Sequence, residues 1–299
     1  MSPAALPAWR SLLYVPVNVE AYVAKAHRRG ADAIILDLED SIAVGDKCAA
    51  RHLVPDAARR AGAGGADILV RINRPLELAV ADIAAALGPD VYGFLLPKID
   101  SASHLRLLAE VIDTREAELG LPSGHTRLVP MVETAAAFPR MHEIAAAHPR
   151  NVAMSLGGED FALATESEPA PDVLLYPKQQ VVIAARAAGI LPIGLIGTVA
   201  EYQDTDAVRE IARRSRRFGF AAGSGIHPMV VPALNEGFGP SADECASARR
   251  IVEAFAAAEK AGRGSVEVDG RMVDIPVVER ARALLTRAER LAERHAVPS

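Results

Sequence analysis

Short apolar runs alternate with longer segments of helical character along most of the chain. Eight runs have the length and composition of buried parallel strands, at residues 11–15, 33–38, 68–72, 92–96, 127–132, 152–156, 191–196 and 220–224. Helical patterns rich in Ala, Arg and Glu lie at 19–29, 47–61, 76–87, 101–119, 135–148, 173–188, 205–217 and 242–261. Such alternation indicates a parallel sheet. Eight βα units in a chain of this length favour a (β/α)8 TIM-type barrel over an open doubly wound sheet.

The pattern changes after Gly262. Residues 265–273 are typical of a β-hairpin that turns at Asp269-Gly270, because Asp-Gly is a strong two-residue turn. Pro276 is well placed to open a last helix that runs to about Ala296. We therefore predict a catalytic barrel at residues 1–262 and a C-terminal hairpin-and-helix arm at 263–299. The apolar stripe of that last helix needs a surface to cover it, and we expect the arm to pack on a neighbouring subunit.

Composition narrows the possible partners and the compartment. The 299 residues carry 33 Lys and Arg against 38 Asp and Glu, a net charge of −5, which argues against a general nucleic-acid or membrane-surface binder. The most apolar stretch, 190–200, is short and broken by Pro192, so we expect no membrane span. Two cysteines, Cys48 and Cys245, cannot form a disulfide framework, and a reducing cytoplasmic setting is expected.

Charged residues end several of the predicted strands, where a barrel of this kind builds its active site. Glu133 and Asp160 follow neighbouring strands, and two carboxylates with water and substrate at the remaining positions suit octahedral Mg²⁺. Glu39 and Asp40 would orient metal-bound water. In the alternative interpretation, Glu133 caps the helix starting at Ala135, and Asp160 pairs with Arg71. Glu39 and Asp40 would then form ion pairs with Lys98 or Arg71 across the rim, which is compatible with holding metal-bound water.

The same rim offers groups for an anion. Arg71 ends strand three, and its planar guanidinium suits a substrate carboxylate or a developing oxyanion. Gly157 and Gly158 would let backbone N–H groups approach that anion closely, unless they merely form a strand-to-helix turn. Substrate is therefore expected to bind between these residues and the carboxylates.

Several ordered motifs together resemble the citrate lyase β-subunit-like (CitE-like) family of the HpcH/HpaI aldolase superfamily. They lie at Arg10–Pro16, Leu36–Ser41, Asp46–Lys47 with Arg51, Val70–Asn73, Leu96–Lys98, Glu133–Thr134, Leu156–Phe161, Ala184–Gly189, Gly219–Phe220, Ile226–Pro228 and Asp269–Pro276. They span nearly the whole chain, which makes the set far more specific than any single motif. The resemblance implies a Mg²⁺-dependent barrel that cleaves or forms a carbon–carbon bond beside a CoA thioester, as in citryl-, malyl- or citramalyl-CoA lyases.

The resemblance also implies roles for particular residues. Glu133 and Asp160 would bind Mg²⁺, with Glu39 and Asp40 holding metal waters, and Arg71 would contact the substrate together with Gly157, Gly158 and Glu159. Arg10, Lys47 and Arg51 match positions expected near the CoA phosphates or the thioester arm. Asp274 matches a tail aspartate that enters a neighbouring subunit's site as the acid/base, and the family is commonly a trimer or hexamer. If the arm instead folds back on its own barrel, Asp274 merely caps the last helix.

Three positions depart from the family pattern. Lys178 stands where the arginine of an Ala-Arg-Ser motif is expected, Gly194 where an aspartate is usual, and Met229 precedes a valine where His-Pro-x-Gln is common. These departures leave the expected metal pair intact and bear on the acyl substrate and the fit of CoA. Two other functions stay open, namely an aldolase of free hydroxy-oxo acids without CoA and a non-catalytic subunit that binds a carrier-linked acyl group.

Overall fold

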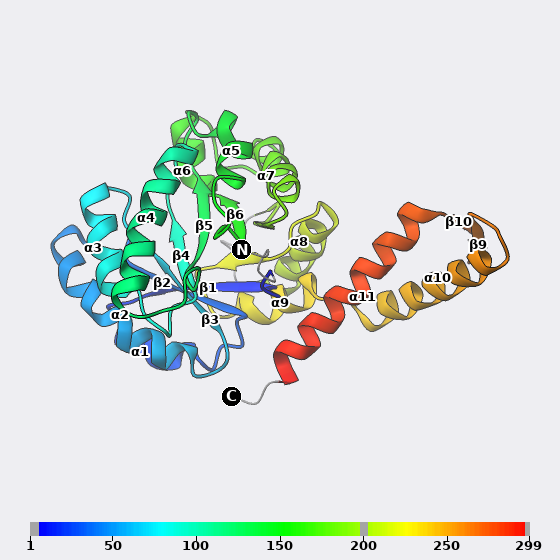
Figure 1. The fold of residues 1–299 in the computed structure, drawn as a ribbon, viewed down its shortest axis with the longest axis horizontal. Helices are drawn as coiled ribbons and strands as arrows, with labels where there is room; N and C mark the ends of the chain where they lie inside the picture. The colour runs from blue at the N-terminus through cyan, green and yellow to red at the C-terminus, as the bar shows by residue number, and fades with distance from the viewer. Residues whose placement is uncertain (1–5, 198–202, 297–299) are drawn as a thin grey trace. The chain divides into compact units, whose positions relative to one another are not determined.

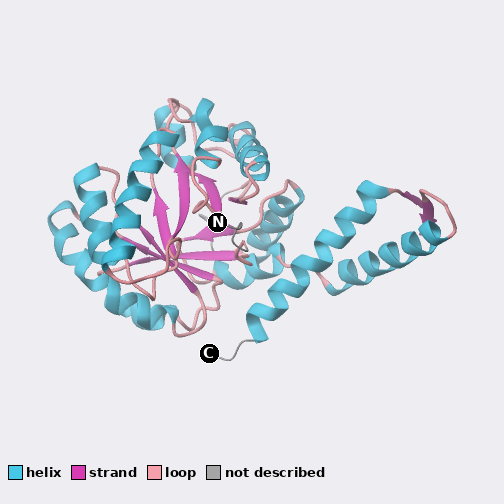
Figure 2. Ribbon diagram, viewed as in Figure 1, coloured by secondary structure: helices cyan, strands magenta, loops and turns pink. Residues whose placement is uncertain are grey.

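The structure, a computed structural model, describes residues 6–197 and 203–296 and divides into two compact units after Phe238. The first unit is built on eight parallel strands. They are β1 Ser11–Pro16, β2 Ala33–Asp37, β3 Asp67–Arg71, β4 Gly93–Leu96, β5 Arg127–Val132, β6 Ala153–Leu156, β7 Leu191–Ile193 and β8 Gly223–Gly225. Their order is β7-β6-β5-β4-β3-β2-β1-β8, and a parallel bridge between Ile193 and Ala222 joins the two outer strands. The ring of strands surrounded by helices confirms the predicted TIM-type barrel (Figures 1 and 2).

Helices follow the strands and cover the outside of the ring. They are α1 Glu20–Ala26, α2 Lys47–Gly62, α3 Leu76–Ala86, α4 Ala102–Glu118, α5 Met141–Ala145, α6 Gly158–Ala164, α7 Leu175–Ala187, α8 Thr205–Arg217 and α9 Val230–Phe238. Short 3-10 turns occupy Val44–Asp46 and Phe138–Arg140. Most boundaries lie within two or three residues of those expected from the sequence.

The helix after β8 differs from the expectation. The eighth barrel helix is α9, whereas the sequence pattern had placed 242–261 in that role. Pro232 and Gly237 weaken the helical pattern of α9, yet Gly237 is required there, because a Cβ at this position would lie 2.4 Å from Ala212 Cβ in α8. The short α6 was also missed, because seven residues beginning at glycine carry little periodic signal.

Side chains alternate between two apolar layers along the strands. Leu12, Ile35 and Leu69 are buried inside the barrel, whereas Leu13 and Ile34 are buried between strands and helices. In the register of the sheet, Pro16 pairs with Asp37 and Asp37 with Arg71. The inward positions at the carboxyl ends of β1, β2 and β3 are therefore Tyr14, Asp37 and Arg71, two residues beyond the inward leucines and isoleucine.

The second unit is a helical hairpin with a small β-hairpin at its end (Figure 1). Helix α10, Ala242–Lys260, begins at a capping box of Ser241 and Glu244, and α11 spans Ile275–Ala296. Between them β9, Val266–Val268, and β10, Arg271–Val273, pair antiparallel. Their turn has positive φ at Asp269 (51°) and Gly270 (73°), as the predicted two-residue turn requires.

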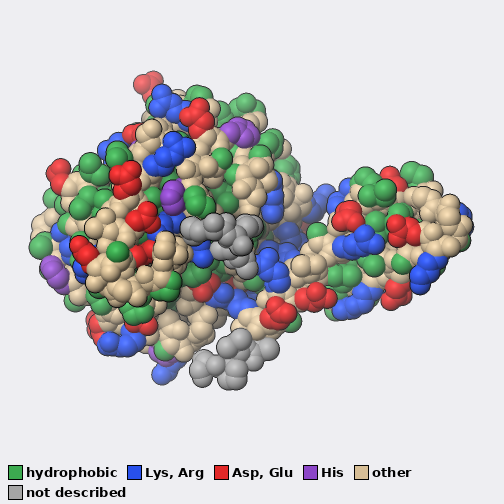
Figure 3. Space-filling model, in the orientation of Figure 1, with side chains coloured by type: hydrophobic (Ala, Val, Ile, Leu, Met, Phe, Trp, Pro, Cys, Tyr) green, Lys and Arg blue, Asp and Glu red, His purple; other side chains and the backbone are tan. Residues whose placement is uncertain are grey.

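Helix α10 belongs to this second unit, so the boundary lies earlier than the position expected after residue 262. The cause is packing, because Phe255 of α10 is buried with Val273 and Val278. This packing covers the beginning of the apolar stripe of α11. Hydrophobic side chains remain visible among interspersed acidic and basic ones on this unit (Figure 3), and Met272 and Ile275 are exposed.

Within residues 6–197 and 203–296, no helix has both the length and the apolarity needed to cross a membrane.

Candidate active site

Arg71 is the centre of an ion-pair cluster at the carboxyl ends of the strands. Its Nε donates to Asp37 Oδ1 (2.7 Å) and its Nη2 to Asp37 Oδ2 (2.8 Å), so the pair is bidentate. Its Nη1 lies 3.1 Å from Asp40 Oδ2 and 3.0 Å from Glu39 Oε2. The Tyr14 ring lies under the guanidinium, with its centroid 5.1 Å from Cζ. These contacts fix the plane of Arg71 at the barrel mouth.

Burial and the neighbouring charges shift the pKa values of the acidic groups in this cluster. Burial alone would raise the pKa of Asp37, but its hydrogen bonds and charge contact with Arg71 hold that pKa below its usual value. For Glu39, desolvation outweighs the attraction of Arg71 and Lys98 and raises the pKa. Burial likewise raises the pKa of the Tyr14 phenol. Asp37 and Arg71 therefore remain a charged pair at neutral pH.

Lys98 links this cluster to the predicted metal pair. Its Nζ lies 3.0 Å from Glu39 Oε1 and 3.2 Å from Asp160 Oδ1. Its backbone has φ of 48°, a left-handed conformation that is uncommon outside glycine, and its N–H donates to Glu133 Oε2 at 2.6 Å. Although desolvation opposes it, the hydrogen bond to Glu39 and the nearby carboxylates raise the pKa of the Lys98 amine.

Glu133 is buried, and its side chain occupies space that only a glycine leaves free. A Cβ at Gly157 would lie 2.1 Å from Glu133 Oε1, so a side chain there would displace the carboxylate. Desolvation raises the pKa of Glu133 to about 7, with Glu39 and Asp160 adding to the effect and the Lys98 N–H opposing it. The capping alternative is not observed, because the Thr134 hydroxyl accepts from Ala137 N. Asp160 pairs with Lys98 and not with Arg71.

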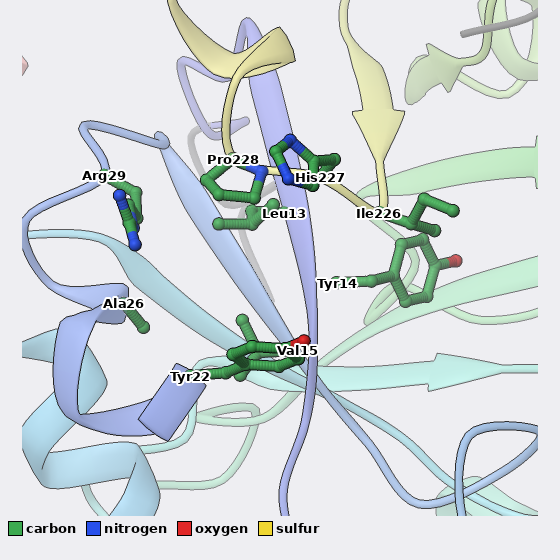
Figure 4. Close-up of a pocket in the computed structure, with 9 residues that line it drawn as sticks. All are labelled: Leu13, Tyr14, Val15, Tyr22, Ala26, Arg29, Ile226, His227 and Pro228. Atoms are coloured by element: carbon green, nitrogen blue, oxygen red, sulfur yellow. The ribbon is translucent and has the colours of Figure 1, made fainter. Parts of the chain in front are cut away.

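A pocket of about 510 Å³ opens beside these groups. Its lining includes most of the predicted site residues, namely Asp40, Arg71, Glu133, Gly157, Gly158, Glu159 and Asp160, together with Asp37, Tyr14 and Tyr22. A smaller pocket of about 210 Å³ adjoins it and shares Tyr14, Tyr22 and Ile226 (Figure 4). Tyr22 of α1 and Arg29, which follows that helix, line it together with the segment Ile226–Pro228 after β8 (Figure 4).

The donor set fits a divalent cation bound by hard oxygen ligands. The cluster joins five carboxylates to two cations, namely Asp37, Glu39, Asp40, Glu133 and Asp160 with Arg71 and Lys98. With every group ionised its charge would be 2 − 5 = −3, which favours uptake of a cation. Among the described residues, no group of three or more His, Cys, Asp or Glu side chains is arranged to hold a metal. Glu133 and Asp160 would therefore leave most positions to water and substrate, as Mg²⁺ prefers.

The structure does not bring Arg10 or Arg51 into this pocket. Arg10 precedes β1, at the opposite end of the barrel, and forms a bidentate pair with the buried Asp32 at 2.9 Å for each hydrogen bond. Arg51 donates to Asp82 Oδ1 at 2.9 Å. Asp82 is fully buried, so it needs that cation. Both arginines neutralise buried aspartates, and their expected contacts with CoA stay a prediction.

Replacing Arg51 tests this structural interpretation. We expect Arg51→Met to lower the free energy of unfolding by roughly 1–3 kcal/mol, because the buried Asp82 loses its charged partner. Asn73 would still donate to Asp82 through its N and Nδ2 atoms, at 2.9 and 2.7 Å. Arg59→Met on the same helix is the matched control, because Arg59 and its partner Asp56 are exposed. Urea unfolding measures the stability, and a weaker affinity for CoA in isothermal titration would restore the ligand-binding role.

Lys47 and Asp274 occupy supporting positions. Lys47 Nζ donates to the backbone oxygens of Leu38 (3.0 Å) and Glu39 (2.6 Å), and so holds the loop that carries Glu39 at the barrel mouth. Asp274 lies in the second unit at the start of α11, where its Oδ1 accepts from Val277 N at 3.4 Å. That contact is the helix-cap arrangement considered in the sequence analysis, and it leaves the second carboxylate oxygen for another partner.

Sequence reasoning missed two contributors to the site, because it gave Asp37 no role and did not single out Tyr14. Lys98 was expected only as an ion-pair partner of Glu39 or Asp40, and the structure pairs it with Glu39 and also with Asp160. Tyr14 borders three neighbouring pockets at the barrel mouth. The alternation of inward positions could have found it, because Tyr14 stands two residues after the buried Leu12.

The fold and this site define a barrel lyase. The sequence profile of the HpcH/HpaI aldolase/citrate lyase family matches residues 10–228. The chain belongs to this family, which confirms the resemblance, and it is an enzyme of the oxo-acid-lyase type.

Curated relatives cover nearly the full chain. The citrate lyase β subunit of Escherichia coli K12 is 35% identical over 285 residues, covering 94% of this chain and 93% of that protein. A (3S)-malyl-CoA thioesterase of Cereibacter sphaeroides is 34% identical over 287 residues, covering 95% and 96%. CitE of Mycobacterium tuberculosis, solved with magnesium, acetoacetate and coenzyme A, is 30% identical with a TM-score of 0.75, covering 96% and 99%.

Proposed function

We propose that the chain catalyses Mg²⁺-dependent cleavage, or the reverse condensation, of a 3-hydroxy-acyl-CoA thioester such as citryl-, malyl- or citramalyl-CoA. The products of cleavage would be an acyl-CoA, such as acetyl-CoA, and a 2-oxo acid. The observation that carries this proposal is the buried Glu133 carboxylate, which lies beside Asp160 and next to an arginine held in a fixed plane. The CitE relative bound to magnesium and coenzyme A supports the assignment of both ligands.

Glu133 and Asp160 would hold the metal, which supplies Lewis-acid polarisation of the substrate oxygens when bound. Arg71 would stabilise negative charge as the carbon–carbon bond breaks. A guanidinium has five N–H donors, and three of those in Arg71 are hydrogen-bonded to Asp37 and Asp40, while Nη1 also lies 3.0 Å from Glu39 Oε2. The second N–H of Nη2 would contact the substrate. Gly157, Gly158 and Glu159 line the pocket beside the metal pair and would bound the substrate. Glu39 and Asp40 would orient metal-bound water.

The proton step needs a separate acid/base. We assign it to Asp274, which would protonate the thioester enolate in cleavage or remove the methyl proton in condensation. Its position in the second unit suits delivery to a neighbouring protomer of a homo-oligomer, either a trimer or a hexamer.

Turnover by the isolated chain tests the function. Purified protein with Mg²⁺ is incubated with each of the three thioesters, and the 2-oxo acid, acyl-CoA and free CoA are quantified separately. Lyase activity releases 2-oxo acid and acyl-CoA in equal amounts. Consumption of free hydroxy-oxo acids but of none of the thioesters would indicate the CoA-independent aldolase instead, and no turnover of either would indicate the non-catalytic subunit.

Thioester hydrolysis is a second candidate function, favoured by the similarity to the (3S)-malyl-CoA thioesterase. In the same assay, hydrolysis releases free CoA without a 2-oxo acid. The ratio of free CoA to 2-oxo acid therefore separates the two reactions.

Mixing two inactive variants tests the shared site. Asp274→Asn and Glu133→Gln protomers are each expected to be inactive, but subunit exchange should restore activity at about a quarter of the sites in an equal mixture. Those sites combine an intact metal pair from one protomer with an intact aspartate from its neighbour. Each variant incubated alone under the same exchange conditions is the control. Activity that stays absent at every mixing ratio would place Asp274 in its own subunit's site, and an Asp274→Asn variant that is active on its own would place Asp274 outside catalysis.

A further inference from the structure

A second pocket continues from the metal pocket along the barrel mouth. Its volume is about 340 Å³, and it shares Tyr14, Gly158, Glu159 and Ile226 with the metal pocket. Most of its other walls are apolar, namely Leu156, Pro169, Leu174, Ile193, Leu195 and Phe220. Lys178 and Ser224 add polar groups. A molecule bound at Asp160 can therefore extend past Gly158 into this space.

Lys178 is the cation of this pocket. It lies in the first turn of α7 and is partly buried. Within residues 6–197 and 203–296, it forms no ion pair or hydrogen bond through its ammonium group, and Glu159 is the opposing charge that acts on it. Burial lowers the pKa of the Lys178 ammonium, and Glu159 only partly offsets this effect. A bound anion would relieve the desolvation of this charge.

Gly194 shapes another part of the pocket wall. A Cβ at this position would lie 2.7 Å from Phe220 Cε1, so the missing side chain lets the Phe220 ring pack against the end of β7. Gly194 and Lys178 line the same pocket, which therefore combines an apolar wall with a cation.

We propose that this pocket binds the part of the oxo-acid substrate remote from the metal, a short aliphatic segment that ends in a carboxylate, and that Lys178 selects for that carboxylate. The proposal rests on the lyase function proposed above and narrows its substrate class to acids with a second, distal carboxylate. Lys178 is a specificity-determining residue, because its ammonium pairs with a group that takes no part in bond cleavage.

The position of the pocket favours a substrate carboxylate over a CoA phosphate as the anion. In a CoA thioester, the whole pantetheine arm separates the phosphates from the reacting carbonyl. The pocket, in contrast, begins at Gly158 and Glu159, directly beside Asp160. The apolar walls suit methylene groups between the reacting carbon and the distal anion.

Binding of two matched acids tests the inference. The affinities of 2-oxopentanoate and 2-oxopentanedioate, which share a carbon chain, are measured by isothermal titration with Mg²⁺ for wild type, Lys178→Met, Lys178→Gln and Lys178→Arg. We expect wild type to bind the dicarboxylate at least ~10-fold more tightly, in line with one charge-assisted hydrogen bond. Both neutral variants should lose that preference while binding the monocarboxylate within about twofold of wild type, and Lys178→Arg should retain it.

A control variant and four possible results decide whether Lys178 binds the distal carboxylate. Lys25→Met, at an exposed position of α1, should leave both affinities unchanged. A wild type without preference, or an equal loss for both acids in the neutral variants, would overturn the proposal. Weakened CoA binding with unchanged oxo-acid binding would also overturn it and assign Lys178 to a phosphate. Retained dicarboxylate preference in a protein that turns over no thioester would reject the lyase function and support the pocket assignment.

Discussion

Glu133→Gln should reduce Mg²⁺-dependent turnover by ~10²-fold or more while the barrel stays folded, because it removes one of only two anionic ligands. Glutamine is nearly isosteric and keeps an oxygen that can accept from Lys98 N, which lies 2.6 Å from Glu133 Oε2. The change therefore removes charge with little loss of packing. Isothermal titration with Mg²⁺ and steady-state kinetics measure the two losses.

The raised pKa of Glu133 gives this variant a second expected effect, on stability. In the folded protein the pKa of Glu133 is about 7, above the reference value of 4.5. The contribution of protonated Glu133 to the free energy of unfolding is therefore fully present below about pH 4.5 and is lost as the pH rises through about 7. At pH 8 without metal, the buried charged carboxylate destabilises the folded protein, so Glu133→Gln should raise the free energy of unfolding by up to about 3 kcal/mol.

Protons and Mg²⁺ compete for the carboxylate oxygens of Glu133, so the affinity of the wild-type protein for Mg²⁺ should fall below pH 7.

Three measurements distinguish this account from a purely structural carboxylate. Melting curves with and without Mg²⁺ at pH 6 and pH 8 should show metal stabilisation of wild type, stronger at pH 8, and none of Glu133→Gln. Glu143→Gln, at an exposed position of α5, should behave like wild type. Unchanged Mg²⁺ affinity in Glu133→Gln, and in Asp160→Asn measured beside it, would remove both residues from the metal site.

The barrel could be predicted from the sequence because the residue patterns of its strands and of its helices are both strong and depend only on neighbouring residues. Alternating strands and helices with glycine and cap residues at their ends need no knowledge of distant contacts. The exception, α9, depends on a contact that the chain pattern does not show, the close approach of Gly237 to Ala212 in α8. Likewise, α10 has a clear helical pattern, but only its packing on α11 places it in the second unit.

The same distinction applies to the site. Glu133, Asp160 and Arg71 were expected to lie at one rim because parallel strands bring their carboxyl ends together, and they line one pocket. Their partners follow from register and side-chain direction, which pair Arg71 with Asp37 and bring Lys98 between Glu39 and Asp160. For Arg10 and Arg51, motif position predicts contacts with CoA, whereas their pairing with the buried Asp32 and Asp82 follows only from the fold.

Arg71→Lys should lower kcat/KM by roughly 10²-fold or more, by analogy with removal of one oxyanion donor. Lysine keeps the positive charge but cannot reproduce the planar fork that Arg71 presents to Asp37 at 2.7 and 2.8 Å. Its ammonium would have to choose between Asp37 and the other carboxylates, and few donors would remain for substrate. The stacking of the guanidinium on Tyr14 would also be lost.

Kinetics and stability together decide what Arg71 does. Asp37 is buried and would keep a cation in the variant, so we expect a stability loss of only about 1–2 kcal/mol beside the large kinetic loss. Arg74→Lys is the matched control, because Arg74 pairs with Asp100 on the exposed rim and should change neither quantity. If Arg71→Lys keeps near wild-type kinetics and loses only stability, Arg71 holds the carboxylate cluster together without touching the substrate. If kcat/KM falls while Mg²⁺ affinity stays at the wild-type value, the guanidinium acts on the reacting acid and not through the metal ligands.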